Sequence, residues 1–562
     1  MTSVAPFAVF FIGAVLVALT RGRPRMIVML AIPIVGALNL MQLDQGIYGQ
    51  IPFLGQELAV VRVDKLSLLF GYLFHLAAFI GIVYSLHLRD TTQHVAGVVY
   101  AGSAIGATFA GDLITLFVFW EFLAVSSVFL ILARRTARAQ AAGMRYLIIQ
   151  VLSGVTLLAG VLVRAHETGS IAFDFIGLEG LAGWLIFLAF GLKCAFPLLH
   201  NWLTDAYPEA TPTGTVFLSA FTTKVAVYAL ARSYPGTEIL IYIGAVMTMF
   251  PIFYAVIEND LRRVLAYSMI NQIGFMVTGI GLGTALAING AVAHAFNDVI
   301  FKALLFMSMG AVLHMTGRIK GSELGGLYKS MPWTTGFCIV GAASISAFPL
   351  FSGFVSKSMV MVAALEEGHP IVWLALLFAS AGVFHHAGIK IPFFAFFSHD
   401  SGIRTTEPPR NMLIAMGIAA AISVFNGSYP WVLYDMLPFP VDYAPYTAAH
   451  VLTQSQLLFF SALAFVWLKL SGLYPPELPG LNIDAEWTYR KAGAVAVARL
   501  GAAATAINRN VLARAQRRIE RFLVQVYRHH GPDGIMARTW STGSTVLWVA
   551  VVLGAYLFVF LL

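Results

Sequence analysis

The sequence has few charged residues and almost no cysteine. Only 11% of its 562 residues are Asp, Glu, Lys or Arg, whereas 59% are hydrophobic and the mean hydropathy is +0.80. This balance excludes a soluble globular domain and indicates an integral membrane protein. The two cysteines, Cys194 and Cys338, form no CxxC motif and no His/Cys cluster. A disulfide framework, a zinc site and an iron–sulfur centre are therefore not expected, and no other cofactor or metal is predicted.

Long hydrophobic runs make up most of the chain. Residues 1–19 carry no basic region ahead of their hydrophobic run, so we expect a first membrane span there and no cleaved signal peptide. The runs predict an all-α polytopic membrane protein with about 16 transmembrane helices. The predicted spans start near residues 5, 25, 65, 95, 112, 143, 183, 213, 237, 263, 285, 333, 370, 411, 451 and 543.

The loops between these spans differ in charge. Basic residues such as Arg21, Arg135 and Arg318 collect after odd-numbered spans, and acidic residues such as Asp174 and Asp442 collect after even-numbered ones. By the positive-inside rule the odd-side loops face the cytoplasm, so both termini are predicted outside a bacterial inner (plasma) membrane. The loop after span 7, "HNWLTDAYPEATP", is an exception because it carries neither Lys nor Arg.

Two stretches, "GLKCAFPLLHNWL" and "SISAFPLFSGFVSK", share the tetrapeptide Ala-Phe-Pro-Leu. The copies start at residues 195 and 347, and their prolines, Pro197 and Pro349, are predicted to break the helices of spans 7 and 12. The offset matches a repeat of five spans, namely spans 4–8 and spans 9–13. Since five is odd, successive copies must enter the membrane from opposite sides, and the repeat is predicted to be inverted.

A basic segment separates the last two predicted spans. Residues 486–530 are rich in Ala and Arg, with apolar residues at helical spacing, and predict an amphipathic helix on the cytoplasmic surface. An anchor for anionic lipid and a helix that clamps a partner subunit both fit this pattern, whereas nucleic-acid binding does not. The predicted segments of the chain are N-terminal transmembrane helices (1–94), the first five-helix repeat (95–235), the second, inverted repeat (236–398), C-terminal transmembrane helices (399–475), the amphipathic segment (476–540) and a final transmembrane helix (541–562).

Titratable residues lie inside several predicted spans, where each costs about 2.5–3.5 kcal/mol on the insertion scale. His294, Asp298 and Lys302 fall at i, i+4 and i+8, so we expect them to stack on one helix face, each within reach of the next. The full set predicts a buried proton relay and consists of Glu121, Lys193, Lys224, His294, Asp298, Lys302 and Lys357, with His385, His386 and Lys390 as further candidates.

A purely structural role is the alternative for each of these groups. Any single intramembrane Lys or Glu could belong to a buried ion pair that only fixes packing. His385 and His386 also fit histidines satisfied in the core or at the interface, and Lys390 also fits a side chain that snorkels to the membrane surface.

Several motifs occur in a fixed order along residues 60–420. They are "WE" in span 5, "GLKCAFPLLHNWLTDAYPEATPTGTVFLSAFTTKVAVYAL" in spans 7 and 8, "DLRRVLAYSMINQIGFM" at span 10, "HAFNDVIFKALLFMSMGAVLH" in span 11 and "AFPLFSGFVSK" in span 12. In them the sequence resembles the antiporter-like subunits shared by respiratory complex I, membrane-bound hydrogenases and Mrp-type cation/proton antiporters. The lysine of "TTKVAVYAL" is most similar to that of the D subunit of Mrp antiporters. The helix and span after residue 480 are more like the distal complex I subunit with its lateral helix, though shorter.

The resemblance implies a role for each of the seven residues of the predicted proton relay. Where relatives often carry a second histidine in span 11, this chain has Asp298, which would hold Lys302 protonated or ligate a cation. The other implied roles are an ion pair in the first half-channel for Glu121 and Lys193, the central lysine for Lys224, the span 11 relay for His294 and Lys302, and the terminal group for Lys357.

These features predict a proton-translocating subunit of a multi-subunit cation/proton antiporter, not an enzyme in its own right. Its expected partners are other membrane subunits, protons and a monovalent cation such as sodium. Alternatives are a proton channel of a complex I-like or hydrogenase-like redox pump, and a subunit that energises inorganic-carbon uptake with a soluble zinc partner. A scaffold that moves no ions and anchors a soluble enzyme is a further alternative.

Overall fold

A computed structural model describes residues 4–53, 55–478, 480 and 482–562. Residues 479 and 481, inside the predicted segment 476–540, lie outside the described residues, as do residues 1–3 and 54. The chain forms two compact units, Met1–Asn482 and Ile483–Leu562.

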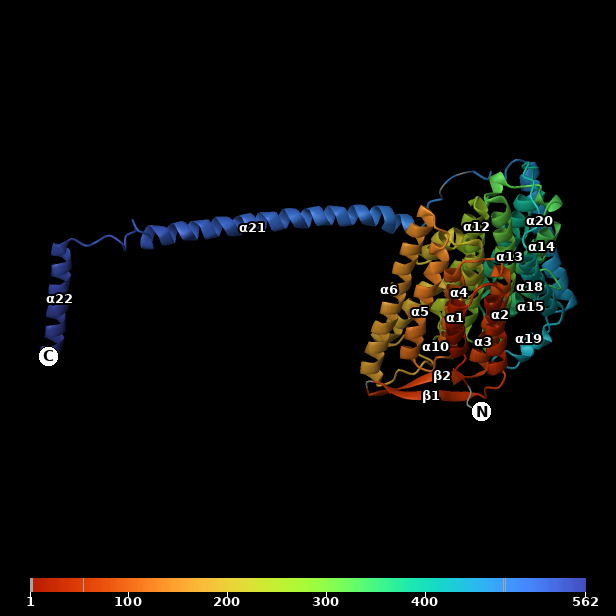
Figure 1. The fold of residues 1–562 in the computed structure, drawn as a ribbon, viewed down its shortest axis with the longest axis horizontal. Helices are drawn as coiled ribbons and strands as arrows, with labels where there is room; N and C mark the ends of the chain where they lie inside the picture. Colours follow the sequence, from red (N-terminus) through yellow and green to blue (C-terminus); the bar gives the residue numbers. More distant parts are fainter. Residues whose placement is uncertain (1–3, 54, 479, 481) are drawn as a thin grey trace. The chain divides into compact units, whose positions relative to one another are not determined.

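The first unit is a bundle of helices, most of which run along a common direction (Figure 1). Its elements are α1 (Ala8–Leu19), α2 (Gly22–Leu40), β1 (Gly46–Phe53), β2 (Gln56–Val63), α3 (Lys65–Ser85), α4 (Thr91–Phe109), α5 (Leu113–Leu132), α6 (Ala137–Thr168), α7 (Gly180–Cys194), α8 (Asn201–Ala206), η1 (Tyr207–Glu209), α9 (Pro212–Ala220), α10 (Thr222–Ser233), α11 (Ile239–Ile257), α12 (Leu261–Leu282), α13 (Ala285–Thr316), η2 (Gly321–Glu323), η3 (Leu327–Lys329), α14 (Pro332–Ile345), α15 (Ser352–Glu366), α16 (Pro370–Val383), the π-helical turn η4 (Phe384–Ile389), α17 (Lys390–Pro392), the π-helical turn η5 (Phe393–Phe397), α18 (Arg410–Ser428), α19 (Trp431–Asp435) and α20 (Ala448–Leu470).

Twelve helical segments among the described residues are long and apolar enough to cross a membrane. They coincide with twelve of the predicted spans, and the other four predicted starts fall at α1, α4, α7 and α14. Large apolar side chains on one side of α6, namely Ile148, Leu152, Val155 and Leu162, are exposed in the isolated chain. Such a stripe fits contact with lipid, so the chain is a polytopic, mostly helical membrane protein. The total of sixteen spans stays a prediction.

A β-hairpin interrupts the helical pattern between α2 and α3. Strands β1 and β2 pair antiparallel, with Gly46 opposite Val63 and Phe53 opposite Gln56. The hairpin lies across one end of the bundle (Figure 1), where Gly111 N donates to Ala59 O at 2.9 Å. The prediction of an all-α chain is therefore wrong for residues 46–63.

Two long helices have matching ends. Both α6 and α13 contain 32 residues, and each begins after a threonine, Thr136 or Thr284, whose side-chain oxygen accepts a hydrogen bond from a first-turn amide. Each ends at a glycine, Gly169 or Gly317, with φ near +70°. Threonine satisfies the free amides at a helix start, and glycine adopts the left-handed turn at a helix end without strain.

The two Ala-Phe-Pro-Leu copies also match in backbone conformation. Ala195 and Leu198 have φ of 62° and 69°, and Ala347 and Leu350 have φ of 57° and 72°. Left-handed conformations are uncommon for residues other than glycine, so the same unusual break occurs twice. It separates α7 from α8 and α14 from α15, in agreement with the predicted breaks in spans 7 and 12.

Two further spans are irregular, which the sequence did not predict. Span 8 is interrupted at Phe221, between α9 and α10. Span 13 contains the π-helical turns η4 and η5 on either side of Lys390. Interruptions of this kind free backbone groups from regular pairing and often occur at functional sites.

Loops predicted on the same side of the membrane lie at the same end of the bundle. A cavity of about 440 Å³ is lined by Asp64, Asp174, Pro235, Gly283 and Pro438, among others, from the segments after spans 2, 6, 8, 10 and 14. These are all even-numbered spans. The loops after spans 5 and 7 meet the start of α12, after span 9, in the cluster described below.

Labelling of single introduced cysteines should separate the two ends of the bundle. Because of the positive-inside rule, cysteine at Arg135 or Arg318 should be protected from an impermeant maleimide in whole cells, and cysteine at Asp174 or Asp442 should react. Permeabilised cells provide the control, since all four sites should then react. Reversed labelling at two or more sites would overturn the predicted orientation.

The second unit contains one long helix and one apolar helix. The long helix, α21 (Ala494–His530), has 37 residues and follows the π-helical turn η6 (Thr488–Gly493), so residues 486–530 are largely helical as predicted. The apolar helix, α22 (Thr542–Leu561), is long and hydrophobic enough to span a membrane. None of the residues of α21 or α22 is buried in the isolated chain.

Candidate functional site

Lys193 lies in the last turn of α7, next to the first break. Its side chain is fully buried, and Nζ donates a hydrogen bond of 2.5 Å to Trp120 O on α5. The ammonium also lies 4.6 Å from the centre of the Trp120 ring. The carbonyl end of a helix carries partial negative charge, and an aromatic face attracts cations, so both features stabilise a charged lysine here.

Glu121, the predicted partner of Lys193, is held against α6. The two side chains interact electrostatically, but the short contact of Lys193 is with the preceding residue, Trp120. Glu121 Oε1 is buried and has no hydrogen-bond partner among the described residues. It occupies the space that a side chain at Gly154 would fill, because a Cβ built there would lie 1.4 Å from Oε1. Gly154 thus makes room for the carboxylate. The expected direct ion pair between Glu121 and Lys193 is not formed among the described residues.

A direct ion pair joins the two halves of the bundle. Lys224 Nζ on α10 lies 2.6 Å from Asp298 Oδ2 on α13, and both side chains are fully buried. The interruption at Phe221 lies one turn before Lys224. There Tyr100 Oη accepts a hydrogen bond of 3.0 Å from Thr222 N, which satisfies a backbone group that the broken helix leaves free.

The stripe on α13, formed by His294, Asp298 and Lys302, makes its polar contacts with other helices. Asp298 pairs with Lys224 rather than with Lys302, whose Nζ donates to Ser268 Oγ at 2.9 Å. His294 Nδ1 lies 3.1 Å from Ser356 Oγ. The three residues therefore make their direct polar contacts with neighbouring helices, whereas His294 Nε2 and Asp298 Oδ1 have no hydrogen-bond partner among the described residues. The groups remain close enough for His294 to interact electrostatically with Lys224 and Lys302.

Lys357 repeats the arrangement of Lys193 with a different residue. Its Nζ donates to Ile345 O, the last residue of α14, at 2.6 Å, and lies 5.2 Å from the centre of the Phe275 ring. Ile345 follows Lys193 by 152 residues, which is also the offset between the two tetrapeptides. In both halves a buried lysine therefore lies at the carbonyl end of a broken helix and beside an aromatic ring. The helix-breaking proline and the nearby lysine thus belong to one structural unit, in which the helix break supplies free carbonyl groups beside the lysine.

Lys390 is fully buried, so the alternative of a snorkelling side chain is wrong. Its Nζ donates to the carbonyls of Ala255, Val256 and Glu258 at 3.2, 2.6 and 2.6 Å, and lies 2.9 Å from Glu477 Oε1. It thus caps the end of α11, as a cation at a helix C-terminus does. Glu477 was not predicted; burial raises the pKa of its carboxyl, and the charge of Lys390 opposes that rise.

The neighbouring histidines have different surroundings. His385 packs among aromatic rings, 5.3 Å from Phe465 and 5.5 Å from Tyr474 between ring centres. His386 is fully buried. The packing of His385 favours the structural alternative for that residue.

Sequence reasoning missed a polar column on α10. Lys224, Tyr228 and Arg232 fall at i, i+4 and i+8, the spacing that marked the α13 stripe. Tyr228 Oη accepts from Arg232 Nε at 2.9 Å, and Arg232 forms two contacts with Asp64, of 2.8 and 2.9 Å. Burial raises the pKa of Asp64, but hydrogen bonds and charge from Arg232 lower it, and the pKa lies below its usual value. Asp64 and Arg232 line the 440 Å³ cavity, so the column runs from Lys224 to that cavity.

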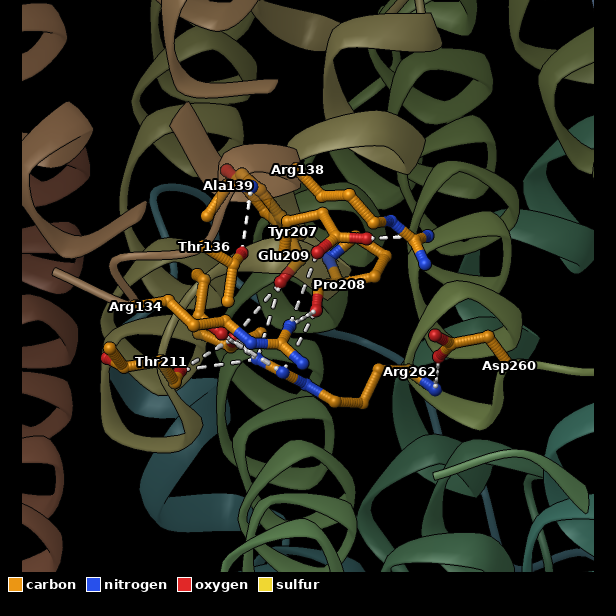
Figure 2. Close-up of polar contacts among 12 residues, drawn as sticks. Arg134, Thr136, Arg138, Ala139, Tyr207, Pro208, Glu209, Thr211, Asp260 and Arg262 are labelled. Carbon is orange, nitrogen blue, oxygen red and sulfur yellow. Dashed lines mark hydrogen bonds and ion pairs between the residues drawn. The ribbon is translucent and has the colours of Figure 1, made fainter. Parts of the chain in front are cut away.

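The loop without basic residues receives arginines from other segments (Figure 2). Arg134 Nη1 donates to Pro208 O at 2.7 Å, and Arg138 pairs with Glu209 at 2.9 Å. Arg262, fully buried at the start of α12, donates to the carbonyls of Pro208 and Ala210, each at 3.0 Å. The loop after span 7 therefore carries no basic residue of its own, but arginines from neighbouring segments place positive charge beside it.

Among the described residues no three His, Cys, Asp or Glu side chains are grouped so that they could hold a metal ion. The site is instead a row of buried lysines, each close to a carbonyl, hydroxyl or carboxylate oxygen. Such an arrangement can hold and pass protons, because its groups gain or lose charge without moving far.

A solved structure has the same fold along nearly the whole chain. A chain of the membrane-bound sulfane sulfur reductase, an archaeal respiratory membrane complex, superposes with a TM-score of 0.72 at 21% identity and covers 98% of this chain and 99% of that chain. The paired helix breaks and the lysines beside them are therefore set in a fold that is known from a respiratory membrane complex.

Comparison with known sequences identifies the family. Residues 110–384 match the family described as NADH:quinone oxidoreductase/Mrp antiporter, transmembrane. The D subunit of the Na(+)/H(+) antiporter of Alkalihalophilus pseudofirmus is 30% identical over 329 residues, which cover 55% of this chain and 66% of that protein. The N subunit of the NADH-quinone oxidoreductase of Desulforudis audaxviator is 32% identical over 350 residues, which cover 57% of this chain and 69% of that protein. The chain belongs to the family of membrane subunits shared by NADH:quinone oxidoreductases and Mrp antiporters.

Proposed function

We propose that the chain is the proton-translocating subunit of a multi-subunit cation/proton antiporter of the Mrp type, similar to the D subunit of such antiporters. Protons would pass along the buried row from Glu121 and Lys193 through Lys224 and Lys302 to Lys357. The Lys224–Asp298 pair carries this proposal, because it places a buried, counter-charged lysine between the two broken helices. The 30% identity to the D subunit of a Na(+)/H(+) antiporter supports the antiporter assignment.

The proposal includes the arrangement in the membrane. Two inverted five-helix repeats, spans 4–8 and 9–13, would form two half-channels related by symmetry. The chain would cross a bacterial inner membrane sixteen times, with both termini outside. Support comes from the matched 32-residue helices and the matched left-handed breaks. In this arrangement Lys193 in span 7 and Lys357 in span 12 act as gates on opposite sides of Lys224, although they do not occupy matching positions of the repeat.

The proposed partners are further membrane subunits, because both named relatives are subunits of larger enzymes or antiporters. The exposed α21 helix would bind either anionic lipid or such a subunit. A second candidate function, the proton channel of a redox-driven pump, is favoured by the 32% identity to an NADH-quinone oxidoreductase subunit.

Everted membrane vesicles that contain the chain with its co-purifying subunits should distinguish these functions. A respiration-driven pH gradient should collapse when Na⁺, K⁺ or Li⁺ is added, because an antiporter exchanges the cation for protons. Vesicles that lack the chain provide the control. Proton movement that responds to an electron acceptor or quinone, and to none of the three cations, would replace the antiporter by the redox pump.

A further inference from the structure

A second cavity lies away from the relay, between the α1–α2 turn and the α3–α4 turn. Its volume is about 640 Å³, within the range of ordinary ligand sites. Its lining includes Arg21, Arg25 and Arg89, together with His87 and His94, and contains no acidic residue. The relay residues lie in other helices, so the proposed proton path does not account for this cavity.

The arginines of the cavity are not ion-paired with carboxylates of the described residues. None of Arg21, Arg25 and Arg89 forms an ion pair within the part of the chain that the structure describes. Arg25 is 8% exposed, and its Nε and Nη2 donate to Thr20 O at 2.8 and 2.5 Å, which fixes the guanidinium without a counter-charge. Asp90, the nearest carboxylate in sequence, caps α4 and lies 3.8 Å from Arg135.

Two further features of the cavity are suited to an anion. Helix α2 starts there after Arg21, and no side chain caps its first turn, so its free amides and partial positive charge face the same region. His87 Nδ1 lies 3.1 Å from Asn411 Nδ2, which holds the ring at the cavity, and the neutral ring carries one N–H. Burial and the nearby His314 lower the pKa of His87 to about 4, so the ring is a neutral donor near neutral pH.

The surroundings of the cavity favour a lipid over a soluble anion. Large apolar side chains at its rim and on the adjoining turns of α1 and α2, namely Leu16, Leu19, Met26 and Ile27, are exposed. A basic pocket beside such a surface can hold a headgroup while acyl chains lie along the helices. We propose that this basic cavity binds the phosphate of an anionic phospholipid headgroup.

Native mass spectrometry of the detergent-purified full-length protein can test the proposal with dioleoylphosphatidylglycerol. The double change Arg21→Gln/Arg89→Gln should weaken its binding about 30-fold, since each arginine contributes about a fivefold gain near a phosphate. The control Arg23→Gln/Arg318→Gln removes the same charge from exposed side chains that do not line the cavity, and should bind like the unaltered protein. Arg25 is left unchanged because it holds the α1–α2 turn through Thr20.

The outcomes separate the sources of phosphate. Dioleoylphosphatidylcholine should bind at least tenfold more weakly than the anionic lipid, and inorganic phosphate should not displace the bound lipid. Equal binding of the two lipids, or equal binding by the cavity variant and its control, would overturn the proposal. Full displacement by inorganic phosphate would assign the cavity to the free anion instead. If the double variant does not fold, Arg89→Gln alone should weaken binding about fivefold and decides the same question.

Discussion

Replacing Asp298 by asparagine is expected to lower proton-coupled transport by about 100-fold or more. The carboxylate lies 2.6 Å from Lys224 Nζ, and both side chains are fully buried. Removing one partner of a buried ion pair costs about 3–5 kcal/mol of stability and disfavours the charge that remains, so Lys224 would no longer hold a proton for transfer. Transport by Asp298→Asn can be measured as cation-induced collapse of the pH gradient in everted vesicles, at matched protein levels.

Two controls separate transport from stability. Asp400→Asn removes an exposed carboxylate that pairs with Arg404, and should leave transport unchanged. The double change Lys224→Met/Asp298→Leu replaces the pair by apolar residues of similar size, which buried sites often tolerate. This double variant should fold as the unaltered protein does but remain inactive in transport. Normal transport by this double variant would show that the pair is purely structural.

Loss of the first half-channel should have a similarly large effect. Glu121→Gln and Lys193→Ala should each nearly abolish transport, whereas Glu121→Asp should retain a part of it because the charge is kept at a shorter reach. The double change Glu121→Gln/Lys193→Ala should be no worse than either single change, since both remove one coupled element. The same vesicle assay measures all four variants. Well-expressed Glu121→Gln with normal transport would contradict the proposed mechanism.

The position of Gly154 offers an independent test of this element. Gly154→Ala adds a methyl group where Glu121 Oε1 now lies, so the carboxylate must move although every charge is kept. Transport should fall as it does in Glu121→Gln. Gly336→Ala is the matched control, because Gly336 also lies in a helix and a Cβ there would meet no atom within 4 Å.

Helix positions could be predicted from the sequence because hydrophobic length and loop charge report directly on the membrane. The hairpin at residues 46–63 escaped prediction because Leu54 and Gly55, between its strands, are not the Asn-Gly or Asp-Gly pair that marks such turns. The breaks at Pro197 and Pro349 were predictable, since proline cannot continue a helix. The interruption at Phe221 has no such residue, and its stability depends on Tyr100, far away in the sequence.

The partners of buried charges were harder to predict than the charges themselves. Spacing placed Asp298 and Lys302 on one face of α13, but spacing within one helix does not determine which neighbouring helix approaches that face. The structure pairs Asp298 with Lys224 and Lys302 with Ser268. The column of Tyr228 and Arg232 could have been found by applying the same spacing rule to α10. Glu477 could not, because it lies in a loop after α20 with no pattern that relates it to Lys390.

Arg262 also bears on the order in which the chain can mature during synthesis. The loop at residues 207–211 is made before α12, yet the carbonyls of Pro208 and Ala210 accept hydrogen bonds from Arg262 on that later helix. Until α12 has been inserted, these carbonyls depend on water or on Arg134. The earlier half of the bundle can therefore complete its hydrogen bonding at this end only after α12 of the later half is in place.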